Sequence, residues 1–98
     1  MTKKLTLGGY VRKLREEKGL LLRQSAAYLQ VDTAFVSKVE RGEKKATREQ
    51  VEKFADFLET DKDALITLWL VDKILDVINN EQQGVAALKL ALKEQRTK

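Results

Sequence analysis

Apolar side chains recur every three or four residues along most of the chain, which is the spacing of one face of a helix. The first segment that follows this spacing contains Leu7, Tyr10, Val11 and Leu14. We therefore expect a helix over residues 7–18. Gly19 follows directly, and glycine readily adopts the left-handed backbone that ends many helices.

Two short helices are expected next, with little chain between them. Residues 23–30 form the first, with two apolar positions three apart, Ala26 and Leu29. The following segment opens with Asp32, whose carboxylate can accept the free amides of a first helical turn. A third helix should begin there, with Val36 and Val39 facing inward.

A loop and a fourth helix follow. Residues 40–46 have no apolar period and contain Gly42, so we expect a loop with a basic edge. Thr47 and Gln50 match a capping box, in which each side chain accepts the backbone amide of the other residue. The helix that this box opens carries Val51, Phe54, Ala55 and Leu58.

Two apolar-rich helices are expected in the C-terminal part. Residues 60–63 repeat the N-terminal signature ahead of a helix over residues 64–78. Gly84 interrupts the pattern, and the last helix covers residues 85–95 with an apolar stripe of Val85, Leu88 and Leu92. The predicted fold class is therefore all-α.

The composition is that of one soluble helical domain. Hydrophobic residues make up 43% of the 98 residues and charged residues 35%, with no proline. The absence of cysteine and histidine excludes disulfides, zinc fingers and catalysis by thiol or imidazole groups. The longest apolar run, residues 68–71, is too short for a membrane span, and residues 1–9 show no signal peptide. We expect a cytoplasmic protein without a membrane contact, a metal or a cofactor.

Positive charge is concentrated in the first half of the chain. Residues 1–50 carry 12 lysines and arginines against 6 acidic residues, whereas residues 51–98 carry 7 against 9. A basic surface of this kind is expected where a protein meets a polyanion such as DNA. Basic residues that merely solvate helices would give the same distribution.

Helical spacing alone would also fit a plain three-helix bundle. Three blocks of sequence in the central segment point to a more specific kind of domain. They are Leu14-Arg15 with Lys18-Gly19-Leu20, the pair Ala26 and Leu29, and the run from Val36 to Gly42. With no gap between Gly19 and Gly42, these blocks resemble the Cro/repressor-type (XRE-like) helix-turn-helix family, which includes phage repressors, restriction-modification controller proteins and many antitoxins. The resemblance extends from about Tyr10 to Ile66. It implies a five-helix lambda-repressor-like DNA-binding domain, here with an additional C-terminal helix.

The resemblance also implies an ion pair between Arg15 and Glu40, which would fix the angle of the helix that begins near Asp32. Removing one partner of a buried pair commonly costs about 3 to 5 kcal/mol, because the other charge is left without its partner. The alternative is a surface pair with little energetic weight.

DNA contacts are expected on and around that helix. Its outward residues should read base edges and thymine methyl groups: Thr33, Ala34, Ser37 and Lys38. Phosphate contacts, which set the register on DNA, are expected from Arg23, Gln24, Arg41, Lys44, Lys45 and Arg48. Phe35 either packs in the core or touches a thymine methyl group. Lys3 and Lys4 form either a minor-groove arm or a frayed terminus.

Two positions depart from the family pattern. Gln30 stands at the turn where the family usually has glycine. Either the turn is strained by about 1 to 2 kcal/mol or the preceding helix continues slightly. Leu22 stands where a polar residue usually touches phosphate, so Arg23 or Gln24 is expected to replace that contact.

The helix over residues 64–78 carries more apolar surface than one face toward the other helices can absorb. Because family members pair through this region, we expect a homodimer through Leu65, Leu68, Trp69 and Ile74. The alternative is that the last helix folds back and covers this surface within one subunit. Residues 1–6 are expected to form an N-terminal arm, residues 7–78 the DNA-binding domain, and residues 79–98 an extension for dimer or partner contact.

The expected function is transcriptional regulation, as a dimer on a pseudo-palindromic operator in double-stranded DNA. The alternative is an antitoxin that binds a partner protein through its C-terminal helices and regulates itself through the helix-turn-helix. An enzyme is not expected: Asp72 and Asp76 have the four-residue spacing of a solvated helical stripe, and no nucleophile or metal-binding set accompanies them. No small-molecule ligand is expected either.

Overall fold

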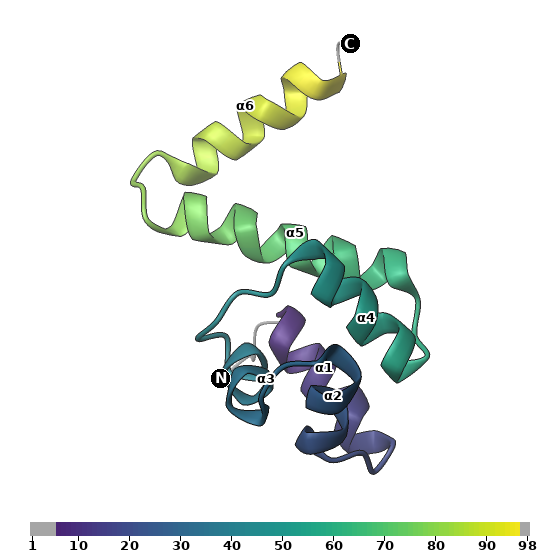
Figure 1. The fold of residues 1–98 in the computed structure, drawn as a ribbon. Coiled ribbons are helices and arrows are strands. Elements are labelled where there is room, and N and C mark those ends of the chain that lie inside the picture. The colour runs from purple at the N-terminus through teal and green to yellow at the C-terminus, as the bar shows by residue number, and fades with distance from the viewer. Residues whose placement is uncertain (1–5, 97–98) are drawn as a thin grey trace.

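The computed structural model describes residues 6–96 and is entirely helical in its regular structure over that range. Its helices, shown in Figure 1, are α1 Leu7–Glu17, α2 Leu22–Leu29, α3 Thr33–Glu40, α4 Arg48–Leu58, α5 Lys62–Asn79 and α6 Gly84–Arg96. The all-α prediction is confirmed, and the expected helix bounds differ from these by no more than two residues. Lys3 and Lys4 lie outside the described residues, so their role stays a prediction.

Side-chain caps explain where α3 and α4 begin. The Asp32 carboxylate accepts the Phe35 amide at 2.8 Å, as expected for an N-cap. Thr47 and Gln50 form the predicted capping box: the Thr47 amide donates to Gln50 Oε1 at 2.9 Å and the Gln50 amide donates to Thr47 Oγ1 at 3.2 Å.

The start of α5 differs from the prediction at residues 60–63. The N-cap is Asp61, and its side chain makes no capping hydrogen bond. Thr60 belongs to the end of the preceding helix, because its amide donates to the Ala55 carbonyl at 3.0 Å. The residue types of a capping box are therefore present there without the capping geometry.

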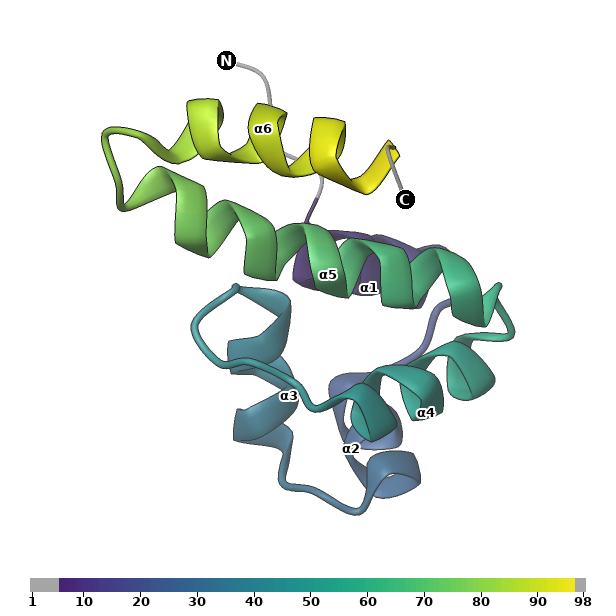
Figure 2. The same cartoon turned by 90° about the horizontal axis from the view of Figure 1, so that it is seen from above.

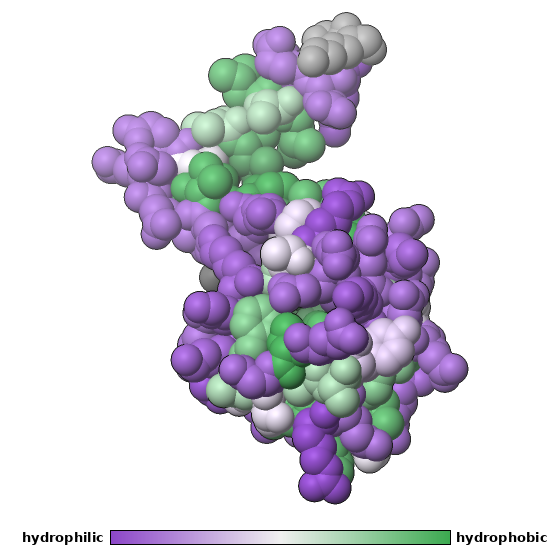
Figure 3. All heavy atoms as spheres, in the orientation of Figure 1, coloured by the Kyte–Doolittle hydropathy of each residue, from purple (hydrophilic) through white to green (hydrophobic). Residues whose placement is uncertain are grey.

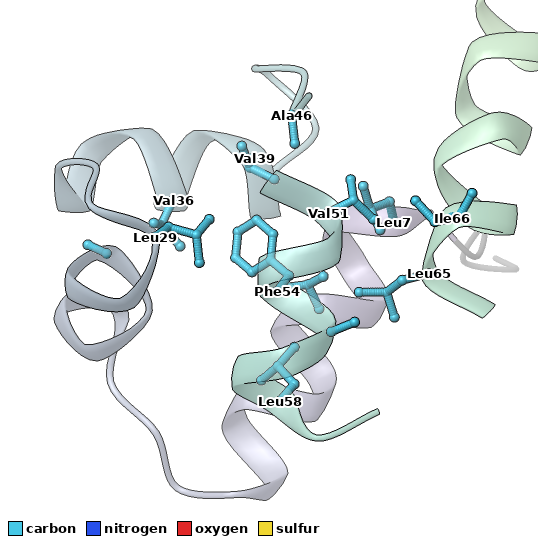
Figure 4. Close-up of a cluster of buried hydrophobic side chains, with 13 residues drawn as sticks. Leu7, Leu29, Val36, Val39, Ala46, Val51, Phe54, Leu58, Leu65 and Ile66 are labelled. Carbon is cyan, nitrogen blue, oxygen red and sulfur yellow. The ribbon is translucent and has the colours of Figure 1, made fainter. Parts of the chain in front are cut away.

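The hydrophobic core lies around α4, as Figure 4 shows. Phe54 and Leu58 of α4 are fully buried, and α4 packs against α1, α2 and α5. Leu65 of α5 is also fully buried in this core. The prediction that Leu65 lies at a dimer interface is therefore wrong, because its side chain is used within its own subunit. Leu68 and Trp69 are partly buried against the same core.

The last helix folds back beside α5, and α5 is its contacting helix among the described residues (Figure 2). The reversal depends on Gly84, where an added Cβ would lie 2.0 Å from the Ile78 carbonyl oxygen. Large apolar side chains nevertheless stay exposed on both helices: Leu70, Ile74, Val77, Val85, Leu90 and Leu92. The alternative in which the last helix covers the apolar face within one subunit is thus only partly realised.

The two ends of the molecule have different characters. In both ribbon views α2 and α3 lie on the side opposite α6, with α5 between α6 and these two helices (Figure 1, Figure 2). Figure 3 shows apolar residues gathered along α6 and the neighbouring part of α5. Over the described residues, no helix combines the length and the apolar character that crossing a bilayer requires.

Candidate nucleic-acid interface

Residues 30–32 alone connect α2 to α3. Gln30 adopts the left-handed conformation, with φ 61° and ψ 44°, and the Val31 amide donates to the Ala26 carbonyl at 3.0 Å. Ala26 is buried and has a small side chain, which allows the two helices to approach closely. The sequence predicted either a strained turn or a slight continuation of the preceding helix. Because α2 ends at Leu29 and Gln30 is left-handed, the turn is the strained one. The geometry is that of a helix-turn-helix.

The side chains of α3 divide into a buried and an exposed face. Val36 and Val39 are buried, as the periodicity predicts. Phe35 is partly buried and packs against the core, which favours the packing interpretation over an exposed contact with DNA. The expected base-reading residues lie on the outer side: Thr33, Ala34 and Lys38 are exposed, and Ser37 is half-buried.

A buried ion pair fixes α3 against α1. Arg15 Nε donates to Glu40 Oε2 at 2.7 Å and Arg15 Nη2 donates to Glu40 Oε1 at 3.1 Å, so the contact is bidentate. The two side chains are 11% and 4% exposed, which excludes the alternative of a surface pair. Arg15 Nη1 also donates to the Leu20 carbonyl at 2.8 Å. The hydrogen bond with Glu40, partly offset by burial, raises the pKa of Arg15 above its ordinary value.

At the end of α3, Arg41 joins the candidate base reader Ser37 to an acidic neighbour. Arg41 Nη1 donates to Ser37 Oγ, and Arg41 Nε donates to Glu43 Oε2 at 2.9 Å. Both groups are exposed; their hydrogen bond and attraction raise the pKa of Arg41 and lower that of Glu43. Arg41 therefore has protein partners that a DNA phosphate would have to share or replace.

The first turn of α2 places two candidate phosphate contacts in solvent. Arg23 and Gln24 are exposed, and Gln24 Oε1 accepts the Leu21 amide at 2.7 Å. Leu22 is partly buried against the core. The departure from the family pattern at Leu22 is thus explained by packing, and Arg23 is the exposed cation beside it.

The remaining candidate phosphate contacts lie on or just after residues 41–47, which we call the basic loop. Lys44 and Lys45 are exposed on this loop, and Arg48 is exposed at the start of α4. Lys45 Nζ pairs with Asp76 of α5, whereas Arg48 Nε lies 3.8 Å from Glu52 Oε2 on its own helix. The basic loop therefore exposes Lys44 and Lys45 to solvent, and Lys45 also contacts α5 through Asp76.

Sequence reasoning missed the role of the acidic residues on α5. Asp72 is half-buried, and its Oδ2 accepts the Leu7 amide at 3.3 Å at the start of α1. Burial raises the pKa of Asp72 above its usual value. Trp69 Nε1 donates to the Ala46 carbonyl at 2.8 Å. The interpretation of Asp72 and Asp76 as a plain solvated stripe is wrong, because both contact other elements, and no local sequence signal marks such long-range partners.

These elements correspond to a known kind of domain. No curated protein matches the chain. A family model described as "Helix-turn-helix domain" matches residues 6–69, which is more than half of the 98 residues. The match includes α1 to α4 and the first part of α5 and leaves α6 outside. The chain therefore belongs to the helix-turn-helix domain family and carries a DNA-binding domain.

Proposed function

We propose that this protein is a Cro/repressor-type (XRE-like) transcriptional regulator that binds a pseudo-palindromic operator as a homodimer in the cytoplasm. The observation that carries the proposal is the exposed row on α3, with Thr33, Ala34 and Lys38 in solvent and the helix held by a buried ion pair. A helix fixed in this way can enter the major groove with its orientation set before binding. A restriction-modification controller and a phage repressor are the two roles that we propose within this class.

The chemistry of the α3 row suits base recognition. The Lys38 ammonium can donate to guanine O6 and N7, and the Thr33 and Ser37 hydroxyls can donate or accept. The Ala34 methyl group suits contact with a thymine methyl group. Flanking groups would bind phosphate and set the register: Arg23, Gln24, Arg41, Lys44, Lys45 and Arg48.

The apolar face of α5 and α6 supports the homodimer. Of the interface residues predicted from sequence, Ile74 is exposed, and Leu68 and Trp69 are partly buried. Leu70 and Val77, the exposed neighbours of Ile74, join the proposed interface. On α6, Val85, Leu90 and Leu92 extend the face. Because α6 lies opposite α3, two copies joined there would keep both α3 helices free (Figure 1). A two-fold dimer would separate them by about 34 Å, one turn of DNA.

A second candidate function uses the same apolar face. In an antitoxin, this surface on α5 and α6 would hold a partner protein, while the helix-turn-helix regulates the gene that encodes both. Sedimentation of the purified chain distinguishes the two, because a stable homodimer leaves this surface occupied and speaks against the antitoxin.

The salt dependence of DNA binding tests the proposed function. We expect Lys44→Ala to flatten the slope of log K against log salt by about 0.9 on a labelled duplex, because one phosphate contact is lost. Lys62→Ala is the matched control: Lys62 is also exposed but is the first residue of α5, and that end of α5 lies away from α3 (Figure 1). Equal slopes for wild type and Lys44→Ala would remove Lys44 from the interface. A wild-type protein that binds no duplex would overturn the function.

A further inference from the structure

One face of α5 contacts the basic loop. Trp69 and Asp76 stand seven positions apart on α5, about two helical turns, so their side chains point to the same side. The Trp69 indole N–H donates to the Ala46 carbonyl oxygen at 2.8 Å, and the Asp76 carboxylate pairs with the Lys45 ammonium. Two consecutive residues of the loop are thus held by one face of α5.

These contacts add to others that hold the loop: Ala46 is buried in the core, and the Glu43 amide donates to the Lys38 carbonyl at 2.8 Å. A cavity of about 270 Å³ lies between the loop, the start of α1 and α5, with Gly8, Val39 and Leu75 among the residues that line it. Close packing therefore supports only part of the loop. The Trp69 ring is itself held, because Lys73 Nζ lies 4.3 Å from the ring centroid in a cation–π contact.

The pair of Lys45 and Asp76 faces solvent. The Lys45 side chain is 74% exposed, so a phosphate group can reach its ammonium. An exposed ion pair adds little to the stability of a fold. The pair does bear on DNA binding, because a lysine that keeps a carboxylate partner brings no net charge to a phosphate and displaces few of the counterions around DNA.

We propose that Asp76 competes with DNA phosphate for Lys45, and that Trp69 is the positioning residue that holds the loop where this competition takes place. The inference rests on the DNA binding proposed above. A contact between Lys45 and phosphate carries no sequence information, so weakening it lowers the affinity for operator and for other duplexes alike. The carboxylate of α5 thereby lowers the overall affinity for DNA and its dependence on salt.

A double-mutant cycle tests the competition. The affinity for one labelled duplex is measured across a salt series for wild type, Asp76→Asn, Lys45→Ala and the double variant. Asp76→Asn should steepen the slope of log K against log salt by about 0.9, because Lys45 then acts as a full phosphate contact. At low salt its affinity should rise about three-fold, the scale of one exposed ion pair. In the Lys45→Ala background the same substitution should change neither quantity.

Two controls keep the outcomes distinct. Asp56→Asn removes an exposed carboxylate from α4 and should leave the slope at the wild-type value. If Asp76→Asn steepens the slope equally with and without Lys45, the substitution acts through overall charge and the competition is overturned. An unchanged slope for Asp76→Asn, with wild type binding normally, overturns the inference and leaves the proposed function intact. Failure of wild type to bind any duplex overturns both.

Trp69→Phe tests the positioning role, because it keeps an aromatic ring and removes the indole N–H. The salt slope should fall by about 0.9 or more as the loop lysines leave their places. The helix content by circular dichroism should stay at the wild-type value. A wild-type slope in Trp69→Phe would assign the ring to packing and overturn its positioning role.

Discussion

Among the ion pairs of the described residues, that of Arg15 with Glu40 is the most buried. It joins the end of α1 to the end of α3, and Arg15 also holds the Leu20 carbonyl. Three segments that are separate in the sequence are thereby fixed at one guanidinium group. Such a pair sets the orientation of α3 and need not add net stability, since burial of the two charges offsets their attraction.

We expect Glu40→Gln to destabilise the fold by about 3 kcal/mol, because the Arg15 guanidinium loses its ionic partner while buried. For a domain of this size the melting temperature should fall by more than about 10 °C. Glu43→Gln provides the matched control, because it disrupts the exposed pair with Arg41 and should leave the melting temperature close to that of wild type. If Glu40→Gln has the melting temperature of wild type, the pair of Arg15 and Glu40 does not stabilise the position of α3.

At the residue scale, some side-chain contacts could be predicted from the sequence and others could not. The Arg15–Glu40 pair followed from the spacing of a known family pattern. The Lys45–Asp76 pair and the Trp69–Ala46 hydrogen bond did not, because they depend on where α5 lies relative to the basic loop. Leu65 was assigned to the wrong surface because helical periodicity shows that a residue is apolar and not which neighbour buries it.

At the scale of elements, two helices end on non-glycine residues in the left-handed region. Gln30 closes α2 with φ 61° and Glu59 closes α4 with φ 53°. Left-handed backbone is unfavourable for residues with a Cβ by roughly 1–2 kcal/mol. The turn of the helix-turn-helix therefore holds strain in the segment that sets the angle between α2 and α3.

Gln30→Gly should relieve that strain and stabilise the fold by about 0.5 to 1 kcal/mol, the gain being limited by the greater freedom of glycine in the unfolded chain. Urea unfolding followed by circular dichroism measures the change. Glu59→Gly should behave in the same way, since it has the same backbone conformation at the end of α4. A loss of stability in both variants would show that neither turn is strained.

Element positions were predictable because periodicity and caps are local properties of the chain. Asp32, Thr47 and Gln50 make the capping bonds that their types indicate. The capping box predicted at residues 60–63 does not form, because the Thr60 amide donates to the Ala55 carbonyl in the turn that ends α4. The return of α6 along α5 could not be assigned from sequence, since it depends on a close approach of Gly84 to Ile78 that no local pattern encodes.

At the scale of the whole molecule, the exposed apolar residues of α5 and α6 gather at one end, and α2 and α3 lie on the opposite side (Figure 1, Figure 3). α5 connects them: its buried residue Leu65 belongs to the core, Trp69 and Asp76 contact the basic loop, and Ile74 and Val77 are exposed. One helix thus joins the proposed dimer surface to the loop that would contact DNA.

Val77→Lys should shift the protein from dimer to monomer, because it places a charge in the proposed apolar interface, where Val77 is 68% exposed in the subunit. Sedimentation velocity measures the change. Leu21→Lys is the control, since Leu21 is 48% exposed at the start of α2 and outside that interface. If wild type sediments as a monomer at micromolar concentration, or if Val77→Lys stays dimeric, the proposed interface is refuted.

Selection of bound sequences from a pool of random duplex DNA tests the central claim most directly. Two α3 helices presented by a two-fold dimer should enrich a symmetric motif, with half-sites whose centres are about one helical turn apart. Substituting Lys38 by alanine should relax the preference for guanine at one position in each half-site. A pool without enrichment after repeated rounds, at a salt concentration where the protein still binds DNA, would contradict a sequence-specific regulator.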